Sequence, residues 1–498
     1  MFYGNDESMI SDGRSTTVEG GTTSRISVTQ HPTPTRTEGE TFKVYATRWF
    51  VLAIVVGLSF SNAMMWQPYT ALTSESARYF CDRPEEGKGC EISTWTAMIY
   101  QICGCAFGII GMYVTDRHGI RPSTLIGSTF NLVGSVFRVV SSVPSLPLHL
   151  RQPFFHTGTA LAATAQPFFL VLSPKVAECW FPANSRALAN VLSFIANPLG
   201  TLLGSLVPIP IVKADVVPTD YDFLWLNGVM LVVPALTFMF ALCLRRSTPP
   251  SPPSPSQLGH NPMSTKEFFK GILACFKTPQ FYVIFVVFGI AFAQLWSFFV
   301  RADNMFSEIG YSRELVAYLI MAATFFGTIG AIAAGAYVDR TKRFKEVVKV
   351  CMIGFTLCAF GMNFFCRHIP TTAAETLVPI VIMAVMGICS VTVFPIGIEL
   401  GIEATFPVQE ATSSGILAVG SQLTVFIVIC IMEMVRETSV VYTRDGSTGW
   451  PKVDANYWFG LDVWCGISTF GAILALVALR PKYKRIEFEL TTTEKIDR

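Results

Sequence analysis

The chain has 498 residues, of which 51% are hydrophobic and 14% are charged, and its formal net charge is +2. A mean hydropathy of +0.46 argues against a soluble protein, which would have to expose large apolar areas to water. The small net charge, without a basic block interleaved with aromatics, argues against nucleic-acid binding. We therefore expect an integral membrane protein with no nucleic-acid partner.

The first half of the chain begins with a polar segment and continues with apolar stretches. Residues 1–45 are rich in Ser, Thr, Gly and charged residues, which predicts a disordered cytosolic tail rather than a cleaved signal peptide. Six stretches near the roughly 20 residues that a bilayer needs follow within residues 46–246. They lie at about 49–70, 95–114, 123–143, 154–172, 187–207 and 223–244.

The second half repeats this organisation after a proline-rich segment. Residues 247–277 begin with a run of Pro and Ser that forms neither helix nor sheet, so we predict an extended cytosolic linker. Six further apolar stretches follow within 278–485, at about 281–299, 315–337, 347–365, 377–394, 414–432 and 457–479, and residues 486–498 are predicted to form a cytosolic tail. The predicted fold is all-α, with twelve transmembrane helices in two six-helix bundles.

The basic residues near helix ends predict the orientation. Lys and Arg concentrate on one side of the predicted spans, which places both termini in the cytosol. The plasma membrane is the expected location, with an endomembrane as the alternative. Cys81 and Cys90 share a short polar loop on the other side, and they are candidates for a disulfide if that compartment is oxidising.

Two motifs recur at nearly the same offset. Asp116, after the second span, matches Asp339, after the eighth, and the Phe-Pro pair ending at Pro182 matches the pair ending at Pro407. The offsets are 339 − 116 = 223 and 407 − 182 = 225. We infer a duplicated six-helix unit, in which a central site lies between two bundles that rock against each other.

The loops that carry these aspartates are predicted to act as a gate. Charged groups beside a glycine turn at Gly119 can hold neighbouring helix ends together in one state and release them in another. The alternative explanation is that these basic residues only mark the cytosolic end of a transmembrane helix. The candidate gating residues of these loops are Asp116, Arg117, Arg121, Asp339 and Arg340.

Acidic residues near the end of the tenth span extend this prediction. Glu399 and Glu403, with Glu410 close behind them, gather at the predicted cytosolic end. They either pair with Lys175 and Arg186 of the first half as part of a gate, or solvate a helix end. A further charge, on Arg138, falls inside the third span and is expected to face the bundle interior, because lipid exposure is costly.

The loop motif resembles the signature of the major facilitator superfamily, Gly-x-x-x-Asp-Arg/Lys-x-Gly-x-Arg. The second copy keeps the spacing from Gly335 to Asp339, whereas in the first copy Gly111 lies one residue too far from Asp116. Longer runs are similar to the feline leukaemia virus subgroup C receptor-related family, which is solute carrier family forty-nine, and most of all to its less characterised branch. These runs include Asn62-Ala-Met-Met-Trp66-Gln-Pro-Tyr69, Ala162-Ala-Thr-Ala-Gln166-Pro-Phe168 and Pro395-Ile-Gly-Ile-Glu399-Leu400.

Four residues near mid-membrane are candidates for substrate binding. Gln166 and Gln422 lie about ten to twelve residues into the fourth and eleventh spans, where an amide needs a partner. Trp66 and Trp296 occupy corresponding places in the first and seventh spans. The resemblance implies that aromatics of these two helices and glutamines of the other two surround a ligand. A helix-to-helix hydrogen bond and an interfacial Trp are the alternatives.

The chemistry of these residues favours one class of substrate. Aromatic faces and neutral amides without a central carboxylate suit an ammonium group. Family members are associated with choline and ethanolamine uptake, with haem export and with vitamin B6, so the resemblance leaves the substrate open. Haem would be expected to need an axial His, Cys or Met, and the 6 histidines fall in tails, loops or helix ends.

We therefore expect an uncoupled carrier of a choline-like or ethanolamine-like amine that works by alternating access. The alternatives are an exporter of haem or another amphipathic molecule, and a receptor or scaffold without transport. No nucleophile and base pair or metal cluster stands out, so neither an enzyme nor a cofactor is expected. The expected partners are a small solute and the lipid bilayer, and a monomer is expected.

Overall fold

Helices form all the regular structure in the described part of the chain, as the apolar periodicity predicts. The computed structural model describes residues 43–80, 92–212, 220–254, 264–308, 313–368, 377–436 and 455–496. Within these ranges, 12 helices are long and apolar enough to cross a membrane. The predicted all-α membrane fold with twelve spans is thereby confirmed. Cys81 and Cys90, and nearly all of the predicted tail 1–45, lie outside the described residues.

The first half supplies six of these spans, and short helices follow two of them. Pro68 begins a new helix after Trp66, because proline cannot continue the hydrogen-bond ladder of the preceding one. The helices are α1 (Thr47–Trp66), α2 (Pro68–Ala71), α3 (Thr73–Phe80), α4 (Ile92–His118), α5 (Ile120–Ser141), α6 (Leu148–Trp180), α7 (Arg186–Leu206), α8 (Pro208–Ile211) and α9 (Asp220–Leu242).

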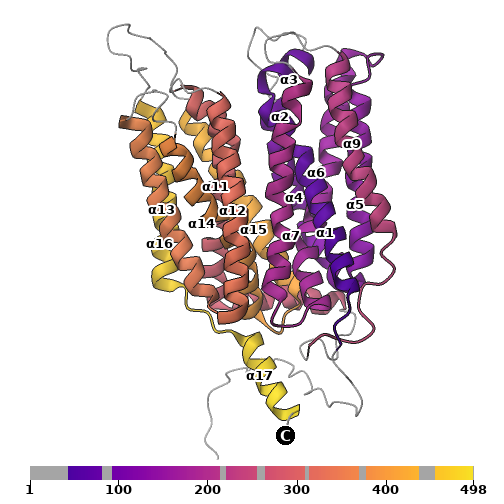
Figure 1. Ribbon diagram of the computed structural model, residues 1–498, viewed down its shortest axis with the longest axis vertical. Helices are drawn as coiled ribbons and strands as arrows, with labels where there is room; N and C mark the ends of the chain where they lie inside the picture. Colours follow the sequence, from indigo (N-terminus) through magenta and orange to yellow (C-terminus); the bar gives the residue numbers. More distant parts are fainter. Residues whose placement is uncertain are drawn as a thin grey trace, which may run out of the picture. The chain divides into compact units, whose positions relative to one another are not determined.

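The second half repeats the six spans and adds two short helices. Figure 1 shows the two sets of spans side by side, the first half in indigo to magenta and the second in red to yellow. The helices are α10 (Thr265–Lys277), α11 (Pro279–Glu308), α12 (Arg313–Thr341), α13 (Phe344–His368), α14 (Leu377–Thr405), α15 (Glu410–Arg436), α16 (Ala455–Ala478) and α17 (Lys484–Ile496).

Small residues let neighbouring spans approach closely. A Cβ atom added to Gly134 of α5 would lie 2.6 Å from the carbonyl oxygen of Gly158 in α6. Close approach at small residues is typical of helix pairs in membranes, where packing replaces the hydrophobic effect. The predicted glycine turn at Gly119 is also confirmed, since its φ of 86° is a conformation that L side chains rarely adopt.

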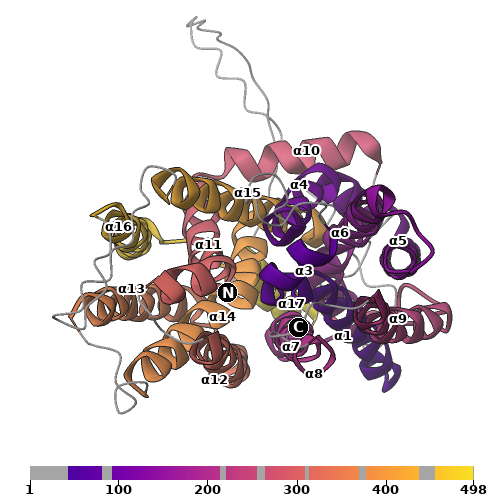
Figure 2. The ribbon, with the colours of Figure 1, turned by 90° about the horizontal axis from the view of Figure 1, so that it is seen from above.

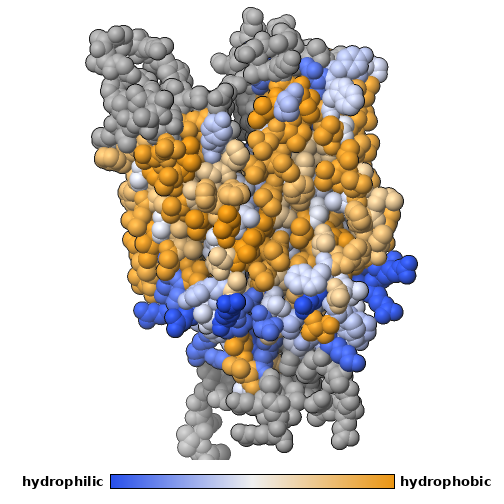
Figure 3. All heavy atoms as spheres, viewed as in Figure 1, coloured by the Kyte–Doolittle hydropathy of each residue, from blue (hydrophilic) through white to orange (hydrophobic). Residues whose placement is uncertain are grey.

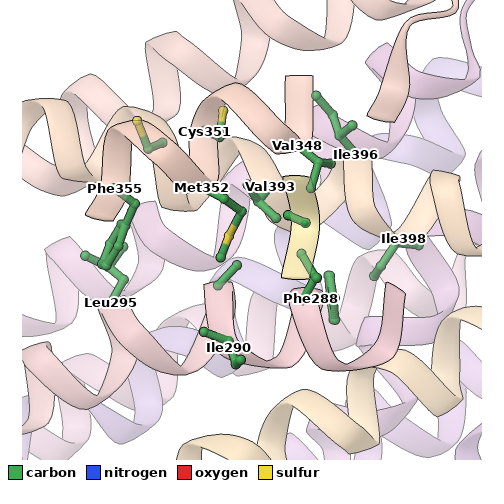
Figure 4. Packing of buried hydrophobic residues seen from close by; sticks show 14 of the residues in the cluster. Phe288, Ile290, Leu295, Val348, Cys351, Met352, Phe355, Val393, Ile396 and Ile398 are labelled. Carbon is green, nitrogen blue, oxygen red and sulfur yellow. The ribbon is translucent and has the colours of Figure 1, made fainter. Parts of the chain in front are cut away.

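Apolar residues fill the interior of each half and also cover its outside. In the second half, Phe288 and Leu295 of α11 pack with Met352 and Phe355 of α13 and with Val393 of α14 (Figure 4). The outer surface in Figure 3 is largely apolar over the spans, and hydrophilic residues gather at one end. Such an exposed apolar band is stable only where lipid replaces water.

Two helices differ from the sequence-based expectation. α10 occupies the end of the predicted extended linker 247–277, and α17 starts just before the predicted tail 486–498. Both have 13 residues, so a search for stretches of spanning length passes over them. α10 begins with a capping box formed by Ser264 and Glu267, a local signal of a helix start.

Candidate functional site

A cavity lies between the two halves, lined by residues of both. Its lining comes from α1, α4, α6 and α7 of the first half and from α11, α12, α14 and α15 of the second. The structure brings together all four residues that the sequence nominates for substrate binding. They are Trp66, Gln166, Trp296 and Gln422.

An aromatic pair joins the two halves beside this cavity. The rings of Trp66, at the end of α1, and Trp296, in α11, have centroids 5.5 Å apart and are tilted by 55°. Trp296 also contacts Phe292 and Phe299 of its own helix, with centroids 5.5 Å and 5.7 Å away. The cavity is therefore lined by several ring faces, which carry partial negative charge and attract cations.

The polar part of the lining consists of amides and hydroxyls. Gln166 and Gln422 approach the same point of α4, because a Cβ atom on Gly104 would lie 3.6 Å from Oε1 of Gln166 and 3.3 Å from Cγ of Gln422. The Oε1 atoms of Gln166 and Gln101 and the hydroxyl of Tyr100 are buried and have no hydrogen-bond partner within the described part of the chain. Unpaired buried polar atoms are costly, so they indicate a place for a polar ligand.

The sequence did not single out Tyr100 and Gln101, although both line the cavity. Their signal is weak, because they stand near the start of the second span, where polar side chains are common. No charged side chain is among the described residues that line the cavity. Attraction inside it must therefore come from ring faces and amide dipoles rather than from a counter-ion.

Arg138 supports the wall of this cavity from behind. Its side chain is buried in α5, as predicted, and Nη1 donates a hydrogen bond to the carbonyl of Met65, next to Trp66. Its guanidinium lies 4.7 Å from the ring centroid of Tyr69 and 5.0 Å from that of Phe155. Arg138 thus satisfies a carbonyl that the break between α1 and α2 would leave unpaired.

Two aspartates join the halves at one end of the molecule, which we call the gate end. Asp339 of α12 accepts hydrogen bonds from the backbone N–H groups of Ala187 (3.1 Å) and Leu188 (2.7 Å), in the first turn of α7. Asp116 of α4 accepts a hydrogen bond of 2.6 Å from the hydroxyl of Thr412, in the first turn of α15. Each carboxylate therefore meets the positive end of a helix dipole in the opposite half.

The cations near these aspartates are lysines rather than the arginines that the sequence predicted for the gate. Lys175 lies 3.3 Å from Asp116, and Lys342 lies 3.8 Å from Asp339. The three arginines of the gating prediction have exposed side chains, and none forms an ion pair with either aspartate. They are Arg117, Arg121 and Arg340. Lys175 lies buried within α6, whereas Lys342 follows the end of α12 and its Nζ donates a hydrogen bond of 3.0 Å to the carbonyl of Ala183 in the first half.

The acidic cluster of Glu399, Glu403 and Glu410 has a cationic partner that the sequence analysis did not predict. Arg485, on α17, contacts Glu399 (2.7 Å), Glu403 (2.8 Å) and Glu410 (2.5 Å) at once. All four side chains are buried, so solvation of a helix end does not explain the glutamates. Of the two alternatives, pairing describes the glutamates, but the cation that contacts all three is Arg485 of α17, whereas Lys175 pairs with Asp116 and Glu178.

The cluster also reaches the first half of the chain. Asn190 of α7 donates a hydrogen bond of 2.5 Å to Glu399, and Arg186 forms an ion pair of 2.8 Å with Glu489 of α17. Side-chain hydrogen bonds of Lys175, Asp339, Asn190, Lys342 and Asp116 join the two sets of spans at the gate end, and a thiol contact joins Cys105 to the carbonyl of Val419. The two halves are therefore held together at the gate end.

Comparison with known sequences yields a family model and several relatives. The model described as Major Facilitator Superfamily matches residues 49–429. An uncharacterized protein of Caenorhabditis elegans is 29% identical over 90% of this chain and 85% of its own length. Solute carrier family 49 member A3 of Xenopus tropicalis is 26% identical over 90% of each chain. Choline/ethanolamine transporter FLVCR2 of Rattus norvegicus is 24% identical over 78% of this chain and 69% of its own.

Comparison with solved structures supports the same architecture. The proton:xylose symporter XylE, bound to 6-bromo-6-deoxy-D-glucose, superposes with a TM-score of 0.66 and 13% sequence identity. The match covers 88% of this chain and 97% of the symporter. At this level of identity the likeness concerns the fold alone.

Proposed function

This chain belongs to the major facilitator superfamily, and from that premise we propose that it carries a small choline-like or ethanolamine-like amine through its central cavity by alternating access. The observation that carries this proposal is the uncharged, aromatic and amide lining of that cavity. A ring face attracts a desolvated cation by about 2 kcal/mol or more without a counter-ion. The amide oxygens of Gln101 and Gln166 supply acceptors for an ammonium N–H or a hydroxyl.

The named relatives point in the same direction. The rat relative is named a choline/ethanolamine transporter, and it shares less than a third of its residues with this chain, so its substrate enters here as part of the proposal. Haem is less well matched, because the described lining of the cavity holds no His, Cys or Met to serve as an axial ligand.

The gate end completes the proposed mechanism. We place it in the cytosol, because the Lys and Arg residues concentrate there. With Asp116, Asp339 and the Arg485 cluster engaged, the cavity is closed toward the cytosol, and separation of the halves at this end would open it. Because the ion pairs form only when the helix ends meet, they stabilise one state over the other.

We expect transport to follow the gradient of the substrate alone. The buried carboxylates Asp116, Asp339, Glu399 and Glu403 all lie at the gate end, and Asp462 of α16 pairs with Arg367 at 2.6 Å, so none lines the cavity. A carrier coupled to protons or sodium usually holds a carboxylate near mid-membrane.

The test is uptake of radiolabelled choline by proteoliposomes that contain the purified protein, with protein-free liposomes as the control. Labelled choline should enter until the inside and outside concentrations are equal, with or without an imposed sodium or pH gradient. Accumulation above that level that collapses with either gradient would contradict uncoupled transport. Uptake no faster than in protein-free liposomes would overturn the proposed substrate, and labelled haem tested in parallel would identify the alternative.

The two aspartates are expected to control turnover rather than affinity. Asp116→Ala and Asp339→Ala each remove charge-assisted hydrogen bonds that form only across the closed gate. Such a bond is worth about 1.5 to 3 kcal/mol, so the equilibrium between open and closed states should shift by roughly tenfold or more. Maximal uptake rate should fall while choline binding stays within about threefold, since neither aspartate lines the cavity.

A matched control for this pair is Arg340→Gln, which changes an exposed charge next to Asp339. It should leave both uptake and binding near the wild-type values. Lost choline binding with an unchanged maximal rate in either alanine variant would show that the aspartates serve the binding site instead.

A further inference from the structure

α10 has a position that its role as a connection does not require. It lies in the segment between the two halves, and a single residue, Thr278, separates it from α11, which enters the membrane. Figure 2 shows α10 along its length, at the edge of the molecule, whereas the spans are seen close to end-on. α10 therefore runs roughly parallel to the membrane surface, at the level where the spans begin.

The faces of α10 differ in character. Successive residues are separated by about 100° around a helix, so Phe268 and Cys275 share one face, which is buried against the protein. Phe269 and Leu273 lie roughly 100–140° away and are 58% and 54% exposed. They form an apolar flank that no described part of the protein covers.

The charged residues of α10 complete this pattern. Three lysines lie within roughly 20° of the face opposite Phe268, their side chains are exposed, and none has an ion-pair partner among the described residues. They are Lys266, Lys270 and Lys277. The remaining flank carries Glu267 and Ala274, so it can face water. An apolar flank, a line of lysines and an aqueous flank, in that order, match the layers of a membrane surface.

We propose that α10 is a binding surface for the anionic phospholipids of the leaflet on its own side. In this arrangement Phe269 and Leu273 insert among the acyl chains, and the three lysines meet the negatively charged headgroups. Each lysine near an anionic surface strengthens binding by about fivefold. This inference goes beyond the transported solute and does not depend on its identity.

The contacts of α10 connect this surface to the gate end. The hydroxyl of Thr265 lies 3.0 Å from the hydroxyl of Tyr113 and accepts a hydrogen bond of 3.0 Å from Arg117, both in the last turns of α4. Phe268 packs edge-on against Tyr113, with ring centroids 5.3 Å apart. A Cβ atom on Gly271 would lie 3.4 Å from Val408, just before α15. Lipid held by α10 therefore stabilises the helix against elements of both halves.

The experiment measures thermal unfolding of the purified full-length protein, without substrate, in nanodiscs of phosphatidylcholine alone and in nanodiscs with one part in three of phosphatidylserine. The anionic lipid should raise the unfolding temperature of the wild type. The variant K266Q/K270Q/K277Q should match the wild type in phosphatidylcholine and lose this rise. The control variant R245Q/R246Q/R343Q removes three exposed charges elsewhere and should keep it.

Two further arms separate the possible outcomes. High salt should erase the rise in the wild type, because surface charges are screened, and soluble glycerophosphoserine added to phosphatidylcholine nanodiscs should not reproduce it. The proposal would be overturned if phosphatidylserine raised the unfolding temperature of the lysine variant as much as that of the wild type. It would also be overturned if the control variant lost the increase as the lysine variant does, or if soluble glycerophosphoserine produced the full increase. Because no substrate is present, these results are independent of whether choline is carried.

Discussion

Replacing Arg485 by glutamine should reduce the maximal uptake rate by more than tenfold. The change leaves Glu399, Glu403 and Glu410 buried at the gate end without the guanidinium that contacts all three. Removing one partner of a buried ion pair costs about 3 to 5 kcal/mol, since the remaining charge is neither solvated nor paired. The closed gate should lose that stability, so both the maximal uptake rate and the unfolding temperature should fall.

Charge compensation makes this prediction specific. A variant that combines Arg485→Gln with Glu403→Gln and Glu410→Gln removes the cation together with two of its anions, and it should recover much of the lost rate. Arg480→Gln alters a nearby exposed charge and should have little effect. Truncation after Tyr483 should resemble Arg485→Gln, whereas a chain end without a role would tolerate truncation. Wild-type uptake in the truncated protein would refute a role for α17 in the gate.

Replacing Trp66 by alanine should weaken uptake of choline by about thirtyfold at low concentration, whereas phenylalanine should retain part of the activity. The ring of Trp66 forms one face of the proposed cation site, beside the ring of Trp296, whose centroid lies 5.5 Å away. A lost cation–π contact of about 2 kcal/mol corresponds to that factor. Phenylalanine keeps a smaller ring face, so its effect should lie between those of the wild type and the alanine variant.

The measurement is the initial uptake rate against choline concentration, at matched surface expression. Trp225→Ala is a suitable control, because this tryptophan is 69% exposed on the outside of α9 and should not affect uptake. If alanine and phenylalanine at position 66 cause equal damage, the attraction of the ring face is not the reason, and the contact with Trp296 serves only to pack the two halves.

The sequence determined the architecture because the bilayer imposes a strict rule on composition. Every span must hide its backbone in a helix and present about 20 apolar residues to lipid, so the twelve spans were readable from hydropathy alone. The same rule located Gln166 and Gln422, since an amide inside an apolar run is conspicuous. The repeat at an offset of 223 to 225 residues relates the two halves through the sequence alone.

The tertiary structure decided which side chains meet. Arg485 lies 75 residues from Glu410 and 86 from Glu399 along the chain, and nothing in a stretch of basic residues after the last span distinguishes it from Lys482 or Lys484. Likewise Lys175 and Lys342, rather than the arginines adjacent to the aspartates, donate hydrogen bonds to the opposite half. Ion pairing depends on distance and burial in three dimensions, whereas hydropathy depends on composition along the chain. The sequence could therefore specify the spans but not the partners of their charges.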